Sequence, residues 1–246
     1  MEYAGITVAP LYVNHFWVIN PAAKCSSAIV ISGVNTDSLT LPAYTSFLSE
    51  SINGTNYNFI TTDSITIDTN GSDAVVLSGI TLKQGNPVSY SFSVDSVSNP
   101  SYIFELPDNN IDLSTLKVVV QKSSSNTSYD IYNLASDYLM LDQNGPIYFL
   151  QESLNGNYQL TFGNGVIGKK LDDGNIVSAT YAITQGSAAV GANNFVLMDT
   201  IGGYSNTTIT PITATTQGGD KESIDSIKYT APKSYSSQGR AVTKED

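Results

Sequence analysis

The stretch from Ile147 to Gly191 constrains the fold more than any other, because it alternates β-forming runs with turn residues: IYFLQESLNGNYQLTFGNGVIGKKLDDGNIVSATYAITQGSAAVG. It predicts three antiparallel strands in a meander, at Ile147–Ser153, Tyr158–Phe162 and Ile176–Thr184. The Asn155-Gly156 dipeptide suits the positive φ angles of a type I′ hairpin turn, as does Asn53-Gly54 earlier in the chain. Glycine permits sharp bends that other residues resist. The predicted structural glycine turns involve Gly54, Gly156, Gly163, Gly165, Gly168 and Gly174.

The composition supports an all-β fold. Charged residues make up 13% of the 246 residues, about half the usual share, and the chain contains 15 tyrosines. Abundant Ser, Thr, Asn and Gly favour twisted strands with many turns and disfavour long helices. We predict a mainly antiparallel fold of two consecutive small sandwich- or barrel-like modules, with a short helix near the C-terminus.

Turn signals about every 8–12 residues suggest how the chain divides. We expect an N-terminal arm or opening strands at 1–27, a first β module at 28–107 and a second at 108–218. Within the first module, 74–83 and 88–94 are expected to form a strand pair. Asp108–Ser114 is interpreted as the connection between the modules. Residues 219–246 would contain a helix, roughly Lys221–Lys228, and a connector to a further domain.

The N-terminal 25 residues are rich in aromatic and β-branched side chains and are broken by two prolines. Two interpretations stay open: an opening strand pair, or an arm that packs on a partner. Tyr12, Phe16 and Trp17 resemble the aromatic anchors of protein interfaces as much as core residues. We therefore include them among the candidate subunit-interface residues.

Charge and cysteine content limit the partners and the cellular compartment to be expected for this protein. The net charge of −11 argues against non-specific nucleic-acid binding, which needs clustered Lys and Arg. The single cysteine, Cys25, allows no intrachain disulfide and fits assembly in a reducing cytoplasm. The first residues lack the pattern of a signal peptide, and no apolar run is long enough to cross a bilayer. We expect no nucleic-acid or membrane partner.

Gly163 to Lys169 matches the first seven positions of the phosphate loop G-x-x-x-x-G-K. The eighth position is Lys170 instead of the Ser or Thr that ligates magnesium. A turn at Asp172-Asp173-Gly174 follows, where a phosphate loop needs a helix N-terminus. A glycine-rich bend between strands is the better interpretation.

Other chemical motifs are equally weak. Asp68–Asp73 (DTNGSD) has alternating oxygen ligands like a calcium loop, but also the residues that any turn prefers. His15, the only histidine, and Cys25 are better explained by structural roles than as a nucleophile–base pair. The acidic residues lie mostly in turn-like contexts. We expect no catalytic, cofactor-binding or metal-binding residues, and no enzyme.

Two segments are the most distinctive: FGNGVIGKKLDDGNIV, starting at Phe162, and the tail APKSYSSQGRAVTKED, which contains Pro232 and Arg240. With several other segments, they resemble the baseplate wedge subunit of T4-like contractile-tailed phages, related to the baseplate J-like proteins. LPAYTSFLSESINGTNYNFIT and Leu116–Tyr132 match in the same order. The resemblance covers about residues 40–246, and residues 1–39 only weakly.

The resemblance implies an architectural role. Members of the family dimerise within a wedge, bind other wedge subunits, join wedges into a ring around the tail hub and take part in the rearrangement that triggers sheath contraction. This chain would be the central β portion of such a subunit, in the virion tail baseplate and assembled in the host cytoplasm. Pro232 and Arg240 then become candidate interface residues. Cofactors are not implied.

Two other functions stay open. A glycan-binding β-sandwich of a virion or surface protein would use Tyr-rich faces to recognise sugars. A polysaccharide-cleaving enzyme would use paired carboxylates, which one sequence does not exclude.

Overall fold

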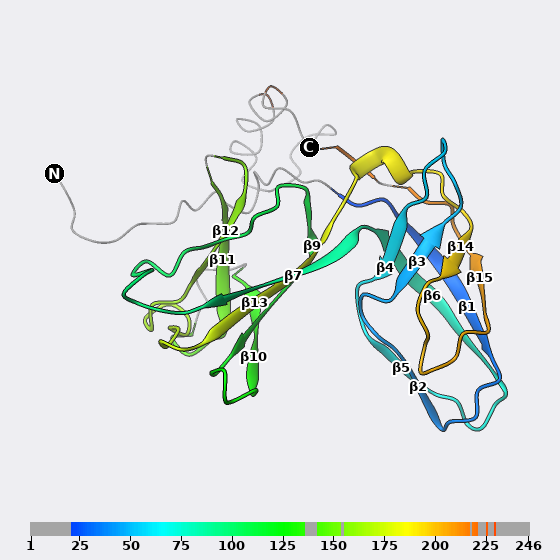
Figure 1. Cartoon of the computed structure of the whole chain (residues 1–246), viewed down its shortest axis with the longest axis horizontal. Coiled ribbons are helices and arrows are strands. Elements are labelled where there is room, and N and C mark those ends of the chain that lie inside the picture. The colour runs from blue at the N-terminus through cyan, green and yellow to red at the C-terminus, as the bar shows by residue number, and fades with distance from the viewer. Residues whose placement is uncertain are drawn as a thin grey trace, which may run out of the picture.

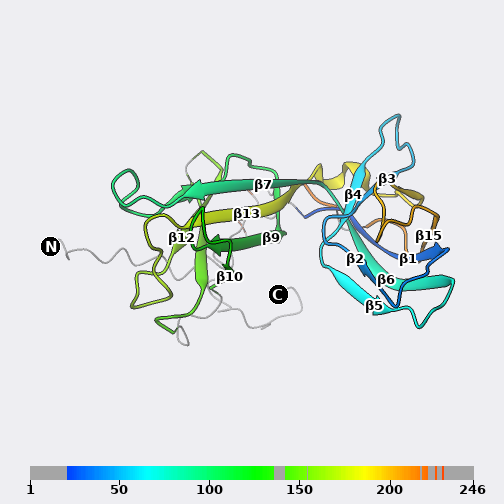
Figure 2. The same ribbon diagram turned by 60° about the horizontal axis from the view of Figure 1, so that its bottom comes forward.

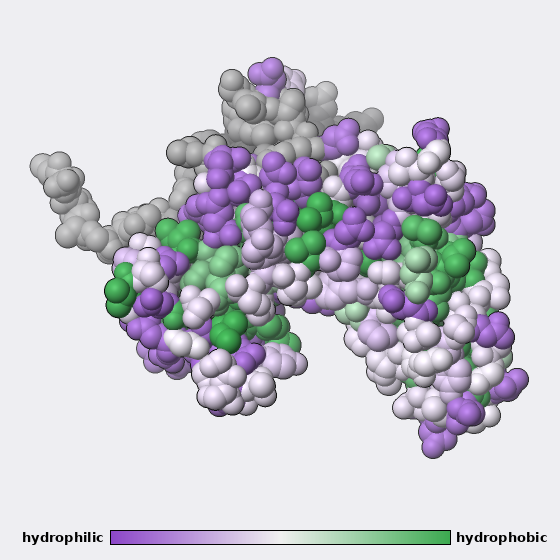
Figure 3. Space-filling model, in the orientation of Figure 1, coloured by the Kyte–Doolittle hydropathy of each residue, from purple (hydrophilic) through white to green (hydrophobic). Residues whose placement is uncertain are grey.

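The computed structural model describes residues 21–135, 142–153, 155–216, 218–220, 225 and 229. The predicted all-β, mainly antiparallel class is confirmed, because the strands form two nearly closed barrel-like modules. The modules lie side by side (Figure 1), and a deep notch separates their lower ends in the space-filling view (Figure 3). The helix expected at 221–228 lies almost wholly outside the described residues. Asp225 and the following described residue, Tyr229, have helical backbone.

The first module contains a six-stranded antiparallel sheet in the order β14-β3-β4-β6-β1-β15. Its strands are β1 (Lys24–Ser32), β3 (Ser46–Ser49), β4 (Asn58–Thr61), β6 (Ala74–Gln84), β14 (Phe195–Leu197) and β15 (Thr207–Pro211), and a separate ribbon pairs β2 (Ser38–Leu41) with β5 (Ile65–Asp68). Alternate residues of β1 are buried, which places Ile29 and Ile31 in the core. Phe59 packs edge-on against Phe195, with ring centroids 4.8 Å apart.

The second module contains a seven-stranded sheet in the order β7-β13-β9-β10-β11-β12-β8. Its strands are β7 (Asn86–Ser93), β8 (Phe104–Glu105), β9 (Ile111–Gln121), β10 (Tyr129–Leu134), β11 (Ile147–Glu152), β12 (Tyr158–Phe162) and β13 (Ile176–Ile183). All neighbours are antiparallel except β10 and β11, which pair in parallel. Val118, Val177 and Tyr181 are fully buried in its core.

The second module is inserted into the first. The chain leaves the first sheet at Gln84 and enters the second at Asn86; it returns after Ile183 through the 3-10 helix η2 (Gly186–Ala189) to β14 and β15. The two crossings, where the chain passes from one module to the other, are in contact. An ideal Cβ on Gly85 would lie 2.9 Å from that of Ala182. The buried Gln84 side-chain oxygen accepts hydrogen bonds from the Thr184 hydroxyl and the Gln185 N–H, both 2.8 Å long.

This topology differs from the expected modules at 28–107 and 108–218. The segments 74–83 and 88–94 do not pair with each other, because β6 and β7 belong to different sheets. The Gln84–Pro87 segment, which carries hairpin-like residues, instead passes the chain between the modules. The predicted connection at Asp108–Ser114 is also wrong in its second half, since Ile111–Ser114 begin β9.

The predicted meander is correct for its first two strands and wrong for the third. β11 and β12 pair as an antiparallel hairpin, from Tyr148 with Phe162 to Glu152 with Tyr158. β13 does not join them; it lies between β7 and β9. Its buried Val177, Ala179 and Tyr181 suit a strand with neighbours on both sides. The turn is also not the two-residue type I′ hairpin expected at Asn155-Gly156, because the Ser153 N–H donates to the Asn157 carbonyl.

Polar contacts join the modules beside the crossings. Lys117 on β9 lies 3.3 Å from the carboxylate of Asp63 and 5.5 Å from the ring centroid of Tyr44, both in the first module. The Tyr44 hydroxyl donates to the Thr115 carbonyl at 3.3 Å. Lys83 on β6 lies 3.7 Å from the buried Asp112 carboxylate. These contacts attach β9 to the first module.

Candidate functional site

The predicted glycine bend at Gly163–Gly168 is a closed loop in which two glycines meet. A Cβ added to Gly163 would lie 2.2 Å from the carbonyl carbon of Gly168, and one added to Gly168 would lie 2.5 Å from Ile147. The loop is held by hydrogen bonds from the Gly165 N–H to the Gly168 carbonyl (3.0 Å) and from the Gly168 N–H to the Asp142 carbonyl (3.1 Å). Glycine is needed here for close backbone approach.

The same loop does not have the surroundings of a phosphate site. The lysine of the G-x-x-x-x-G-K pattern, Lys169, forms an ion pair with Asp130 at 2.6 Å. A hydrogen-bonded turn follows at Asp172–Asn175, in place of the helix that a phosphate loop opens. The motif therefore belongs to the scaffold.

The other predicted glycine turns behave as turns. Asn53 and Gly54 have φ angles of 51° and 86°, and Ile52 and Thr55 exchange backbone hydrogen bonds across them. This is the two-residue type I′ geometry predicted from Asn53-Gly54. Gly156, Gly165 and Gly174 also have positive φ.

The motif at Asp68–Asp73 forms a turn. Asn70 and Gly71 have positive φ, and the Ser72 N–H donates to the Thr69 carbonyl at 2.9 Å. Among the described residues, no group of three or more His, Cys, Asp or Glu side chains is placed to hold a metal ion. The oxygen-rich composition of this segment is explained by its turn.

Cys25 is buried on β1, where burial raises the pKa of its thiol. Its sulfur lies 3.7 Å from the Ser27 hydroxyl. His15, its suggested partner, lies outside the described residues, as do the candidate interface residues Tyr12, Phe16, Trp17, Pro232 and Arg240.

Several carboxylates have structural partners. Glu105 accepts hydrogen bonds from the side-chain amides of Asn155, Asn157 and Gln159 at 2.7–3.1 Å. These bonds, the one from Asn155 foremost, lower the pKa of Glu105. Asp108 accepts the Tyr181 hydroxyl at 2.7 Å. These acids bind neighbouring strands and loops together.

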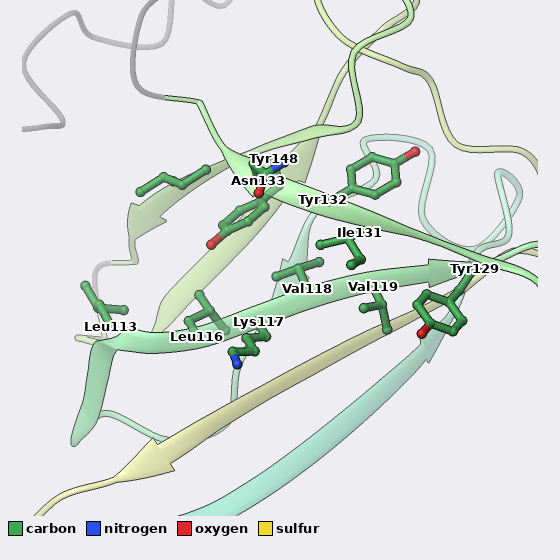
Figure 4. A pocket seen from close by; sticks show the side chains of 11 residues that line it. Leu113, Leu116, Lys117, Val118, Val119, Tyr129, Ile131, Tyr132, Asn133 and Tyr148 are labelled. Atoms are coloured by element: carbon green, nitrogen blue, oxygen red, sulfur yellow. The ribbon is translucent and has the colours of Figure 1, made fainter. Parts of the chain in front are cut away.

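An apolar pocket of about 630 Å³ lies at the centre of the second sheet, between β9 and the strands β10 and β11 (Figure 4). β10 pairs with β9 only from Val118 to Gln121, so the first half of β9 has no neighbour on that side among the described strands. The sheet opens there. The lining comes from β9 (Leu113 and Leu116 to Val119), β10 (Tyr129 and Ile131 to Leu134) and Tyr148 of β11.

The chemistry of this β9–β10 pocket suits apolar contact. Lys117, its one charged lining residue, already contacts Asp63 and Tyr44. Burial raises the pKa of Tyr132 and of Tyr148 to about 12, so both phenols stay neutral at physiological pH. Tyr129 and Ile131 are 62% and 61% exposed and form the rim. The pocket can take an apolar or aromatic group and offers few polar contacts.

The sequence contains little sign of this pocket. The β-forming residues of Tyr129–Leu134 (YDIYNL) predict a strand, and its apolar residues point to both faces. A half-buried strand normally alternates apolar and polar residues. Apolar residues on both faces are therefore the available sequence signal for the pocket. The opening itself depends on where β10 leaves β9, which is a property of the tertiary fold.

Comparison of the chain with protein-family models and with curated proteins gave no match. The part of the chain that the structure describes has no helix long and apolar enough to span a membrane.

Proposed function

We propose that this protein is a structural component of a contractile phage tail baseplate wedge, which acts through protein–protein contacts. The observation that carries the proposal is the role of the segment FGNGVIGKKLDDGNIV, the most specific part of the resemblance. Its glycines meet in a closed loop, its Lys169 is paired with Asp130, and its Asp172–Asn175 turn leads into β13. The segment maintains a scaffold, which suits an architectural family.

The β9–β10 pocket supports a role in contacts with other proteins. Its rim is exposed and apolar, and buried anchors in such pockets carry much of the energy of protein interfaces. The proposed partners are other baseplate wedge subunits, with a homodimer of the full-length protein within each wedge.

Cryo-electron microscopy of the particle tests this proposal. We expect density for two adjoining barrels in the ring at the tail end, repeated around the hub. A particle lacking the chain should assemble tails without a complete ring, and the wild-type chain should restore it. Location of the chain in the capsid or in host-surface appendages would refute the proposal.

A matched pair of variants tests the contact role of the pocket. Ile131→Asp places a charge on the rim, whereas Val97→Asp changes an 89% exposed residue on a loop away from the pocket. If the pocket binds a wedge subunit, only Ile131→Asp should prevent incorporation into particles while the purified protein stays folded. Equal incorporation of both variants would exclude the pocket from the interface.

A glycan-binding module is the second candidate, favoured by the exposed ring of Tyr129 beside the pocket. Aromatic rings of this kind stack on sugar faces. A glycan array should then give binding to a defined sugar that Tyr129→Ala removes; binding that survives this change would exclude the site.

A further inference from the structure

Strand β7 forms an open edge of the second module. It pairs with β13 along its whole length, from Asn86 with Ile183 to Ser93 with Ile176. It is the terminal strand of its sheet, so no described strand pairs with its other side. In Figure 2 β7 is the uppermost labelled strand of the second module. Within the part of the chain that the structure describes, the outer side of these eight residues therefore has no strand partner.

The hydrogen-bond pattern identifies the backbone groups on the open side. Val94, directly after β7, donates its N–H to the Asn175 carbonyl and accepts the Gly174 N–H, both at 2.9 Å. In an antiparallel pair such bonds recur at every second residue, so Phe92, Tyr90 and Val88 bond to β13. The backbone groups of Ser89, Ser91 and Ser93 then point to the open edge.

Side-chain distances agree with this assignment. Antiparallel residues that exchange no backbone hydrogen bonds lie closer together, and their side chains meet. The Ser91 hydroxyl is 2.8 Å from that of Ser178, and the Ser89 hydroxyl is 3.1 Å from that of Thr180.

Apart from Pro87 near its start, this edge lacks the features that usually prevent strand addition. Proteins protect edges with charges, prolines, bulges or very short strands. β7 has no charged residue, its proline is at the second position, and its register with β13 is regular throughout. The described edge strands elsewhere are shorter, and β15 ends in Pro211. A long open edge of this kind is explained if another strand covers it.

The surroundings of β7 indicate the chemistry of that strand. One face carries the serine hydroxyls, and the other carries Tyr90, which is 42% exposed, and Phe92, which packs on the core. At the C-terminal end, Asp95 and Asp173 accept hydrogen bonds from Ser96, Val97 and Ser98. Among the described residues neither carboxylate has an ion-pair partner.

We propose that β7 accepts an extended segment of another protein as an added strand. That segment alternates Ser or Thr with apolar residues, the apolar ones covering Tyr90. It carries a Lys or Arg at the end near Asp95 and Asp173, where charge complementarity favours a cation. A second copy of this chain is disfavoured by its own net charge of −11. The inference does not depend on the proposed function.

The test uses a synthetic eight-residue peptide, Lys-Ser-Val-Thr-Tyr-Thr-Val-Ser with blocked ends, added to the ¹⁵N-labelled full chain. Antiparallel addition places its N-terminal Lys near Asp95. In the free protein the amides of Ser89 and Ser91 should exchange quickly with solvent and that of Tyr90 slowly. The peptide should protect Ser89 and Ser91 and leave Tyr90 unchanged.

Variants separate edge pairing from other binding. Ser91→Pro removes one outward N–H and should weaken peptide binding at least about tenfold, whereas Ser91→Thr should bind like wild type. A peptide with Glu in place of Lys should bind about fivefold more weakly. The proposal is overturned if the peptide does not bind, if Ser91→Pro binds equally well, or if Ser89 and Ser91 are already protected in a dimer of this chain.

Discussion

Replacing Gly163 by alanine should destabilise the second module far more than the same change at Gly174. The two positions differ in the source of strain. Gly163 does not have a positive φ, so its cost is steric: the new Cβ would lie 2.2 Å and 2.3 Å from the carbonyl carbon and oxygen of Gly168. Gly174 has a φ of 88° with no atom within 4 Å of the added Cβ, so its cost is conformational.

The geometry sets the expected magnitudes. Non-bonded carbon atoms prefer separations of about 3.5–4.0 Å, so the two backbone segments must separate by more than about 1 Å. That movement breaks the bond from Gly165 to Gly168 and strains the one from Gly168 to Asp142. With about 1 kcal/mol for each hydrogen bond and about 1–3 kcal/mol for overpacking, we expect a loss of about 3–5 kcal/mol. The left-handed conformation at Gly174 should cost alanine about 1–2 kcal/mol.

Urea unfolding followed by circular dichroism measures both changes in the free energy of unfolding. Hydrogen exchange at the core amides of β9 and β13 assigns the loss to the second module. The reasoning is refuted if Gly163→Ala is as stable as Gly174→Ala, because the loop would then relax without cost.

Two further predictions concern titratable groups. Burial raises the pKa of Tyr132, Tyr148 and Tyr158 to about 12, against about 10 in an unfolded chain. Because the folded-state pKa values are the higher ones, the stability that these tyrosines contribute is complete below about pH 10. It is lost as the pH rises towards about 12. Circular dichroism and tyrosinate absorbance should show unfolding in that window, and ionisation of all tyrosines near pH 10 without unfolding would contradict it. Cys25 is buried and has a raised pKa, so it should react with iodoacetamide more slowly in the folded protein than in denaturant, by at least a factor on the order of 100. Equal rates would show that the core of the first module is open.

The sequence predicted individual strands better than their pairing. The bounds of Tyr129–Leu134 and Tyr158–Phe162 agree with the structure, because β-forming residues and flanking turns are local signals. The sequence does not single out β2 and β5, because four alternating residues each are too few to mark a strand.

The pairing errors have a common physical cause. β13 pairs with β7 and β9, which lie far from it in the sequence, so no turn next to β13 predicts this pairing. Gly85 looks like a hairpin residue, yet it is needed because its backbone lies against Ala182 and Ile183. The β9–β10 pocket likewise depends on strand divergence, so local patterns could not locate it.

The insertion of one module into the other also sets an order of folding during synthesis. All strands of the second module lie between Asn86 and Ile183, so it can form as soon as this stretch has left the ribosome. The first sheet needs β1 to pair with β15, as Ile29 does with Ile209. The inner barrel is then complete while the outer one still waits for its last two strands, and the buried side chains of β1 stay without their full cover until translation has passed Pro211.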